Sequence, residues 1–175
     1  MTDILVERHW DQALSDADMH GILASAGGCL GIHRVSWHGS RLSADGHETF
    51  CHFSAADAES VRIALNQAGS PRGHVWAGTV HDAPGFTNDF LARANVLVSR
   101  SFEPPVEFEE VQAIEHAGAS CLLTHRVHRV RTYLSIDRRR VTSLYQAPDA
   151  ESVRLALYDV SMPVERVWAF RQFCP

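Results

Sequence analysis

The sequence repeats itself at an offset of 92 residues. The segment SAADAESVRIAL at 54–65 returns as QAPDAESVRLAL at 146–157. Without any gap, the same offset pairs Val6 with Val98, Arg8 with Arg100, Cys29 with Cys121, His33-Arg34-Val35 with His125-Arg126-Val127, Pro71 with Pro163, and Val75-Trp76 with Val167-Trp168. A repeat of this length indicates a duplicated domain rather than a short solenoid unit.

The duplication divides the 175 residues into two domains, each of about 80 residues. We place the first repeat at 1–80, a linker at 81–95 and the second repeat at 96–175. Domains of this size have marginal hydrophobic cores, so the two are expected to bury a face against each other.

Each repeat is predicted to run strand, helix, strand, strand, helix, strand. In the first repeat the predicted strands are 4–10, 30–42, 47–54 and 74–80. One helix begins at Ser15 or Asp16 and runs to Ala26, where Gly27-Gly28 ends it, and the duplicated segment forms the other helix. The second repeat ends with a strand at 166–173.

This order is typical of the ferredoxin-like split βαβ unit, in which both helices cover one face of a four-stranded antiparallel sheet. The predicted fold class is therefore α+β, with two ferredoxin-like domains in tandem packed sheet against sheet as a pseudo-dimeric α/β barrel. The open faces would enclose a cavity, which is the usual place for a binding site.

Charge and histidine are distributed unevenly between the repeats. Residues 1–92 carry a net charge of −6 and residues 93–175 one of +1, and 8 of the 11 histidines lie at or before His81. The hairpin of the second repeat is rich in arginine and could bind phosphate groups. The third strand of each repeat, however, lacks the aromatic pattern of RNA-recognition motifs, so we expect no nucleic-acid partner. A signal peptide, an apolar run of membrane-spanning length and CxxC pairs are all missing. These absences predict a cytoplasmic protein with reduced thiols and no membrane partner.

The hairpin and second helix of each repeat resemble a known family. The residues that carry the resemblance are Ser43-x-Asp45-Gly46-x-x-Thr49-Phe50-Cys51-x-Phe53, Ala55-x-Asp57-Ala58-Glu59-x-Val61-Arg62 and Gly69-x-Pro71, with Ala147-Pro148-Asp149-Ala150-Glu151-x-Val153-Arg154 in the second copy. The pattern is similar to that of small bacterial ferredoxin-like domains, some members of which are described as nickel-binding proteins. The resemblance implies the fold, and it implies nickel or another divalent metal ion as a cofactor.

The candidate metal ligands are His9, His38, Cys51 and His52, all in the first repeat. If Leu42 pairs with His47 across the turn at 43–46, His38 lies opposite Cys51, and facing residues on paired strands have neighbouring Cβ atoms. His9 on the adjacent strand is a plausible third ligand. Imidazole suits nickel, zinc and copper, and thiolate adds affinity for softer ions.

The second repeat departs from this set, because Ser143 and Leu144 stand where the first repeat has Cys51 and His52. Metal binding is therefore expected in the first repeat alone. The alternative is that His38 is a partly exposed strand residue and Cys51 a core thiol, since a slip of one residue in the register would separate them.

Two matched pairs are candidates for a different kind of site. His33 and His125, predicted on the second strands, are candidate catalytic acid/base groups, because imidazole titrates near neutral pH. Alternatively, each satisfies a local hydrogen bond. Arg8 and Arg100, at the ends of the first strands, are candidate ligand-binding residues for an anion, or they pair with carboxylates of their own domains.

Three functions remain open from the sequence. The first is a protein that binds a divalent, nickel-like metal ion. The alternative is a cofactor-free dimeric α/β-barrel enzyme, such as an isomerase, a cyclase or a small monooxygenase, with a histidine-lined cavity. The third is a structural or regulatory module. The expected partners are a metal ion or a small-molecule ligand, and a homo-oligomer is left open.

Overall fold

The computed structural model describes residues 1–175 and divides into two compact units. Unit 1 comprises Met1–Gly78 and Arg171–Pro175, and unit 2 comprises Thr79–Phe170. These units differ from the predicted bounds of 1–80, 81–95 and 96–175 because the last strand of each repeat crosses the boundary. The end of β4 (His74–Asp82) belongs to unit 2, and the end of β8 (Arg166–Phe173) belongs to unit 1.

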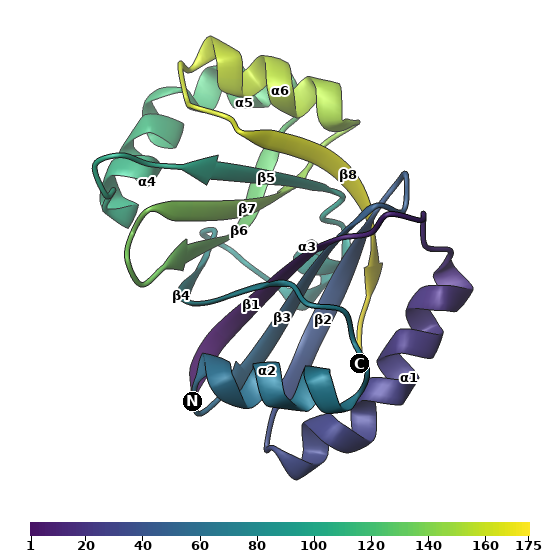
Figure 1. Ribbon diagram of the computed structural model, residues 1–175. Coiled ribbons are helices and arrows are strands. Elements are labelled where there is room, and N and C mark those ends of the chain that lie inside the picture. Colours follow the sequence, from purple (N-terminus) through teal and green to yellow (C-terminus); the bar gives the residue numbers. More distant parts are fainter. The chain divides into compact units, whose positions relative to one another are not determined.

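Unit 1 is an antiparallel sheet with two helices on one face (Figure 1). Its elements are β1 (Thr2–His9), α1 (Asp16–Ile32), β2 (Ser36–Ser43), β3 (Glu48–Ala55), α2 (Ala58–Gln67) and the first part of β4. Strand β1 pairs with both β3 and β4, and β2 pairs with β3. Between the sheet and the helices lies a core that includes Ile4, Val6, Met19, Leu30, Cys51, Phe53, Val61 and Leu65.

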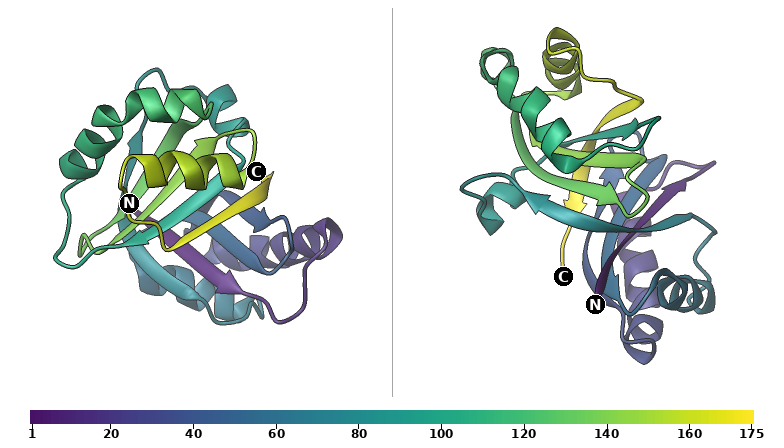
Figure 2. Two further views of the ribbon diagram at one scale, coloured as in Figure 1. Left: turned by 90° about the horizontal axis from the view of Figure 1, so that it is seen from above. Right: turned by 90° about the vertical axis from the view of Figure 1, so that its left-hand side faces the viewer.

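Unit 2 repeats this plan (Figure 2). Its elements are α3 (Asn88–Ala92), β5 (Val96–Ser101), α4 (Phe108–Ala117), α5 (Ala119–Thr124), β6 (His128–Ser135), β7 (Arg140–Gln146), α6 (Ala150–Asp159) and most of β8. Strand β5 pairs with β7 and β8, and β6 pairs with β7. The predicted βαββαβ order is thus confirmed, and the predicted linker contains the end of β4 and the short helix α3.

The duplicated segment forms helices α2 and α6. Each begins after an aspartate N-cap: the carboxylate of Asp57 accepts a hydrogen bond from the Ser60 backbone N–H at 2.8 Å, and Asp149 accepts one from Ser152 at 2.7 Å. The buried residues of the two helices are Val61, Ala64 and Leu65, and Val153, Ala156 and Leu157. The most similar segment of the two repeats is therefore a structural element that faces the sheet.

The first helix differs from its prediction. It continues through Gly27-Gly28 to Ile32, and a hydrogen bond from the His33 backbone N–H to Cys29 closes it. Glycine within a helix costs only about 1 kcal/mol relative to alanine, and the burial of Leu30 in the core offsets that cost. Strand β2 consequently begins at Ser36 instead of Leu30. No helix of the structure combines the length and the apolar character needed to span a membrane.

The β2–β3 hairpin also differs, by two residues, from the predicted register. Leu42 pairs with Thr49, whereas the sequence predicted His47 as its partner. The Ser43 hydroxyl accepts a hydrogen bond from the backbone N–H of Glu48 at 2.8 Å. This bond closes a longer turn, so the strands begin to pair further from the turn than the sequence indicated.

Candidate functional site

His52 lies on the face of the unit 1 sheet that turns away from α1 and α2, which we call the helix-free face. Successive strand residues point to opposite faces, and its neighbours Cys51 and Phe53 belong to the core beneath the helices. His52 pairs with Leu5 of β1 and is only 5% exposed. A polar ring at a buried position of this kind needs a partner.

A β-bulge brings His38 to the same face. The register between β2 and β3 shifts between Trp37, which pairs with Phe53, and Gly39, which pairs with His52. His38 is the extra residue between them, and its ring centroid lies 4.8 Å from that of His52. Gly39 has a φ of 138°, which L side chains rarely adopt. The bulge therefore produces a pair of imidazoles that regular pairing would separate.

Each imidazole of the pair has a hydrogen-bond partner. The Nε2 atom of His52 lies 2.8 Å from Oδ1 of Asp3, and Nε2 of His38 lies 2.8 Å from Oγ of Ser54. Burial lowers the pKa of His52 to about 4, against the opposing effect of Asp3, and the nearby charges of His38 and Arg41 lower it further. His52 is therefore uncharged at neutral pH.

The second repeat keeps the bulge but not the cluster. Its register shifts between Arg129 and Arg131, so the bulged residue is Val130. Leu144 and Asn95 stand at the positions that match His52 and Asp3, and Asn95 bonds instead to the backbone of Ala147. The histidine pair is thus a property of the first repeat.

The side chains around His38 and His52 are of types that bind divalent ions, but they are too few to surround one. Imidazole nitrogen and carboxylate oxygen are both nickel ligands, yet no group of three or more His, Cys, Asp or Glu side chains is arranged to hold a metal ion. Asp3 does not add a third ligand to the pair, because its carboxylate bonds to His52. Carboxylates in this position orient the histidines that bind a metal ion. The residues fit a site with two imidazoles, not a closed cage of three or four ligands.

The two other predicted ligands lie elsewhere. Cys51 points into the core, where the Ser40 hydroxyl donates a hydrogen bond to its Sγ at 2.9 Å. Ser40, not His38, is the residue opposite Cys51, so the predicted facing pair is wrong, because the longer turn and the bulge both move His38. His9 ends β1, is exposed and bonds to Glu48 at 2.9 Å.

The matched histidines His33 and His125 are the C-cap residues of α1 and α5, not strand residues. Nε2 of His33 lies 2.8 Å from the amide oxygen of Gln67, and Nε2 of His125 lies 3.0 Å from a carboxylate oxygen of Asp159. Each ties the end of one helix to the end of a neighbouring helix. This placement agrees with the alternative of local hydrogen bonding in each domain.

Arg100 is part of a hydrogen-bonded network inside unit 2 and is fully buried. Its guanidinium donates to the hydroxyl of Ser143 at 3.2 Å and to that of Tyr145 at 2.8 Å. Tyr145 donates to Glu115 at 2.6 Å, and Glu115 forms an ion pair with Arg129 at 2.6 Å. Arg100 therefore lies in the core of unit 2, where it is bonded to side chains of its own domain.

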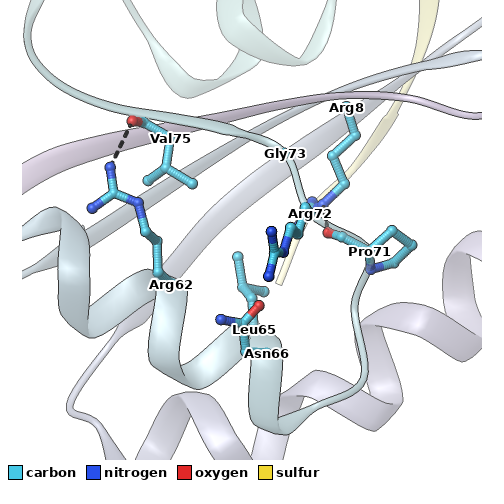
Figure 3. A pocket seen from close by; sticks show the side chains of 8 residues that line it. All are labelled: Arg8, Arg62, Leu65, Asn66, Pro71, Arg72, Gly73 and Val75. Carbon is cyan, nitrogen blue, oxygen red and sulfur yellow. Dashed lines mark hydrogen bonds between the residues drawn. The ribbon is translucent and has the colours of Figure 1, made fainter.

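Arg8, its counterpart, lines a pocket of about 310 Å³ in unit 1 (Figure 3). Its Nε donates to the backbone carbonyl of Pro71 at 3.0 Å. The lining residues come from β1, from α2 and from the segment before β4: Arg8, Arg62, Leu65, Asn66, Pro71, Arg72, Gly73 and Val75. The structure therefore places one of the two predicted ligand-binding arginines in a pocket.

Sequence reasoning missed Asp3 beside His52 and Arg72 beside Arg8. A usable signal existed in both cases, because the repeat is broken there: Asn95 replaces Asp3, and Val164 replaces Arg72. Comparison of the two copies position by position would have found both residues.

The fold defines an α+β protein of two ferredoxin-like repeats, of which the first carries the pair of neighbouring imidazoles. The chain belongs to the family described as nickel responsive protein SCO4226-like, which matches residues 5–77 and 97–169. One matched segment falls in each repeat, so the predicted family and the duplication are confirmed. No curated protein matches the sequence.

Two solved structures resemble the chain in fold. The siroheme decarboxylase NirDL has a TM-score of 0.53 at 10% identity, over 98% of this chain and 72% of that one. A mutant chlorite dismutase from Candidatus Nitrospira defluvii has a TM-score of 0.50 at 11% identity, over 98% and 92%. At such identities the similarity concerns the fold alone. It confirms the predicted fold class, tandem ferredoxin-like domains of the kind found in dimeric α/β barrels.

The Glu115 network predicts a large effect on stability. Glu115→Gln would leave Arg129 as a buried cation without its carboxylate and would weaken the network that links Tyr145 to Arg100, which should lower the free energy of unfolding by about 3 kcal/mol. Urea denaturation of the wild type and the variant measures the change. Glu109→Gln, on the exposed side of the same helix, is the control, and an equal loss in both variants would contradict the assigned role.

His52 predicts a pH dependence of stability in the metal-free protein. Because its pKa falls from 6.5 to about 4 on folding, the unfolded chain binds more protons between these values. The stabilisation is complete above pH 6.5 and is lost as the pH falls towards 4, by up to ~3 kcal/mol. His52→Leu should remove this share of the pH dependence, whereas His116→Ala should leave it unchanged. Denaturation series at pH 4 to 7 would show whether the two variants differ.

Proposed function

We propose that this chain binds a divalent metal ion of the nickel type through His38 and His52 of the first repeat. The observation that carries the proposal is the pair of imidazoles 4.8 Å apart on the helix-free face, produced by the bulge at His38. Neighbouring imidazoles are suitable donors for nickel, zinc and copper ions.

The surroundings of the pair support this function. Asp3 and Ser54 each bond to one ring, and such contacts fix the orientation and the tautomer of metal-binding histidines. His38 is exposed, so an ion can approach from solvent. The second repeat, which has Val130 and Leu144 at the matched positions, provides no comparable pair.

The same surroundings argue for modest, reversible binding. The chain supplies two imidazoles, and Arg41 disfavours positive charge at His52. A site of this strength would release its ion as the concentration falls, which suits a sensor or buffer better than a permanent structural site. The description of the family as nickel responsive is consistent with this behaviour.

Calorimetric titration of the metal-free protein with nickel chloride tests the proposal. His38→Val and His52→Leu introduce the side chains that the second repeat carries, and each should weaken nickel binding by about 10-fold or more. Asp3→Asn, which introduces the residue found at Asn95, should weaken binding by about 10-fold, because it removes the carboxylate that orients His52.

His116→Ala is the control, because His116 is exposed on α4. Equal affinity in His38→Val, His52→Leu and His116→Ala would exclude the pair as the binding site. Broadening of the His38 and His52 proton resonances by paramagnetic nickel would locate the ion independently.

A further inference from the structure

The pocket beside Arg8 has a strongly basic lining. Three of its eight lining residues are arginines, Arg8, Arg62 and Arg72, and none is a carboxylate. In Figure 3 the guanidinium of Arg72 points from the loop towards Leu65 and Asn66 of α2. Arginines that converge in a pocket without a carboxylate in its lining repel one another, so an anion between them would be stabilised.

Arg8 is the most constrained of the three. Its side chain is more than nine-tenths buried, and its only hydrogen bond is the one from Nε to Pro71. The two terminal nitrogens have no protein partner, and neither is among the fully buried atoms. Arg8 is one of the residues that line the pocket. A buried guanidinium with unused donors is costly unless an acceptor is supplied.

The direction of the Arg8 side chain depends on which side chains occupy the core between the sheet and the helices. In unit 2 the matched Arg100 turns into the core because Ser143 and Tyr145 offer hydroxyl groups. In unit 1 the equivalent positions hold Cys51 and Phe53, which offer no comparable oxygen. The guanidinium of Arg8 is therefore directed to the pocket instead.

Gly73 holds the side chain of Arg8 in this position. A Cβ atom at Gly73 would lie 2.7 Å from Cγ of Arg8 and 2.7 Å from the backbone oxygen of Glu7. The loop backbone thus packs directly on the aliphatic part of the arginine, an approach that only glycine permits.

Arg62 and Arg72 differ in whether a carboxylate offsets their charge. Arg62 forms an exposed ion pair with Glu59 at 3.1 Å and donates to the carbonyl of Val75 at 3.3 Å. Arg72 is exposed and has neither an ion pair nor a hydrogen bond. Two unpaired cations, Arg8 and Arg72, therefore face the pocket, and Arg62 adds part of a third.

We propose that this pocket binds the phosphate group of a small organic molecule. Guanidinium groups match phosphate oxygens in geometry, and two unpaired cations suit a dianion better than a single carboxylate. The pocket volume of about 310 Å³ is at the lower end for ligand sites. Leu65, Pro71 and Val75 supply an apolar wall for the organic part of the ligand.

The second repeat has lost or never had this site. Val164 replaces Arg72, Glu165 replaces Gly73, and Tyr158 replaces Asn66. The Glu165 carboxylate accepts a hydrogen bond from Ser101 at 2.6 Å, near the end of β5. Val164 removes one cation, and Glu165 adds an anion. The side chain of Glu165 also occupies the space that Gly73 leaves free for the close approach of the loop in unit 1. The basic pocket is therefore found in unit 1 alone.

The test is calorimetric titration of the metal-free full chain, at constant ionic strength, with phenyl phosphate, inorganic phosphate and benzoate. We expect phenyl phosphate to bind more tightly than the other two, because it combines a dianion with an apolar ring. Arg72→Val, which introduces the residue of the second repeat, should weaken that binding by about 10-fold or more. Arg154→Gln, at the position that matches Arg62, is the control and should have no effect.

Arg8→Met provides a second variant, and circular dichroism establishes whether it folds. If it does not, Arg72→Val decides, since Arg72 is exposed and makes no contact that the fold needs. Absence of phenyl phosphate binding, equal binding of benzoate, or equal affinity in Arg72→Val and Arg154→Gln would each overturn the proposal. The metal site can fail without affecting this result, because His38 and His52 are not among the residues that line the pocket.

Discussion

Both units depend on the burial of one helix face against one sheet face. Val61 and Ala64 of α2, and Val153 and Ala156 of α6, have no exposed surface. Domains of this size have little core to spare, so the residues that meet in this layer cannot diverge far without loss of stability. The strand alternation then leaves every second residue to the other face, where divergence costs less.

The matched arginines show how a small change within this layer redirects a functional group. Arg8 and Arg100 stand at the same point of the same strand, yet only Arg100 has Tyr145 in reach. A buried guanidinium must find oxygen atoms or remain at the edge of the core. Phe53 stands at the position of Tyr145 and has no hydroxyl group, so the guanidinium of Arg8 remains at the edge of the core. The hydroxyl groups of Ser143 and Tyr145, which Cys51 and Phe53 lack, thus separate an arginine that holds the core together from one that lines a pocket.

The sequence was sufficient for the order of elements but not for their register. Duplication and helical periodicity predicted two βαββαβ domains, because both depend on which residues are apolar. The register of the hairpin depends on the Ser43 side chain, which accepts the Glu48 backbone N–H, and on a bulge at His38. Neither changes the apolar pattern. Likewise, Gly27-Gly28 was an adequate stop signal on its own, but the core contact of Leu30 carried α1 beyond it.

The difference between the copies is informative only when burial is taken into account. Cys51 becomes Ser143, which suggested chemistry, but each bonds to the hydroxyl opposite it, Ser40 or Thr132, at 2.9 Å. The replacement of Cys51 by Ser143 therefore keeps a small hydrogen-bonding group in the core and leaves the exposed surface unchanged. His52 lies one residue further on and faces the other side of the sheet, where its replacement by leucine removes an imidazole pair. For these two neighbouring residues, the broken repeat therefore marks a candidate site at His52, which points away from the helix–sheet core, and only a change of core packing at Cys51, which points into it.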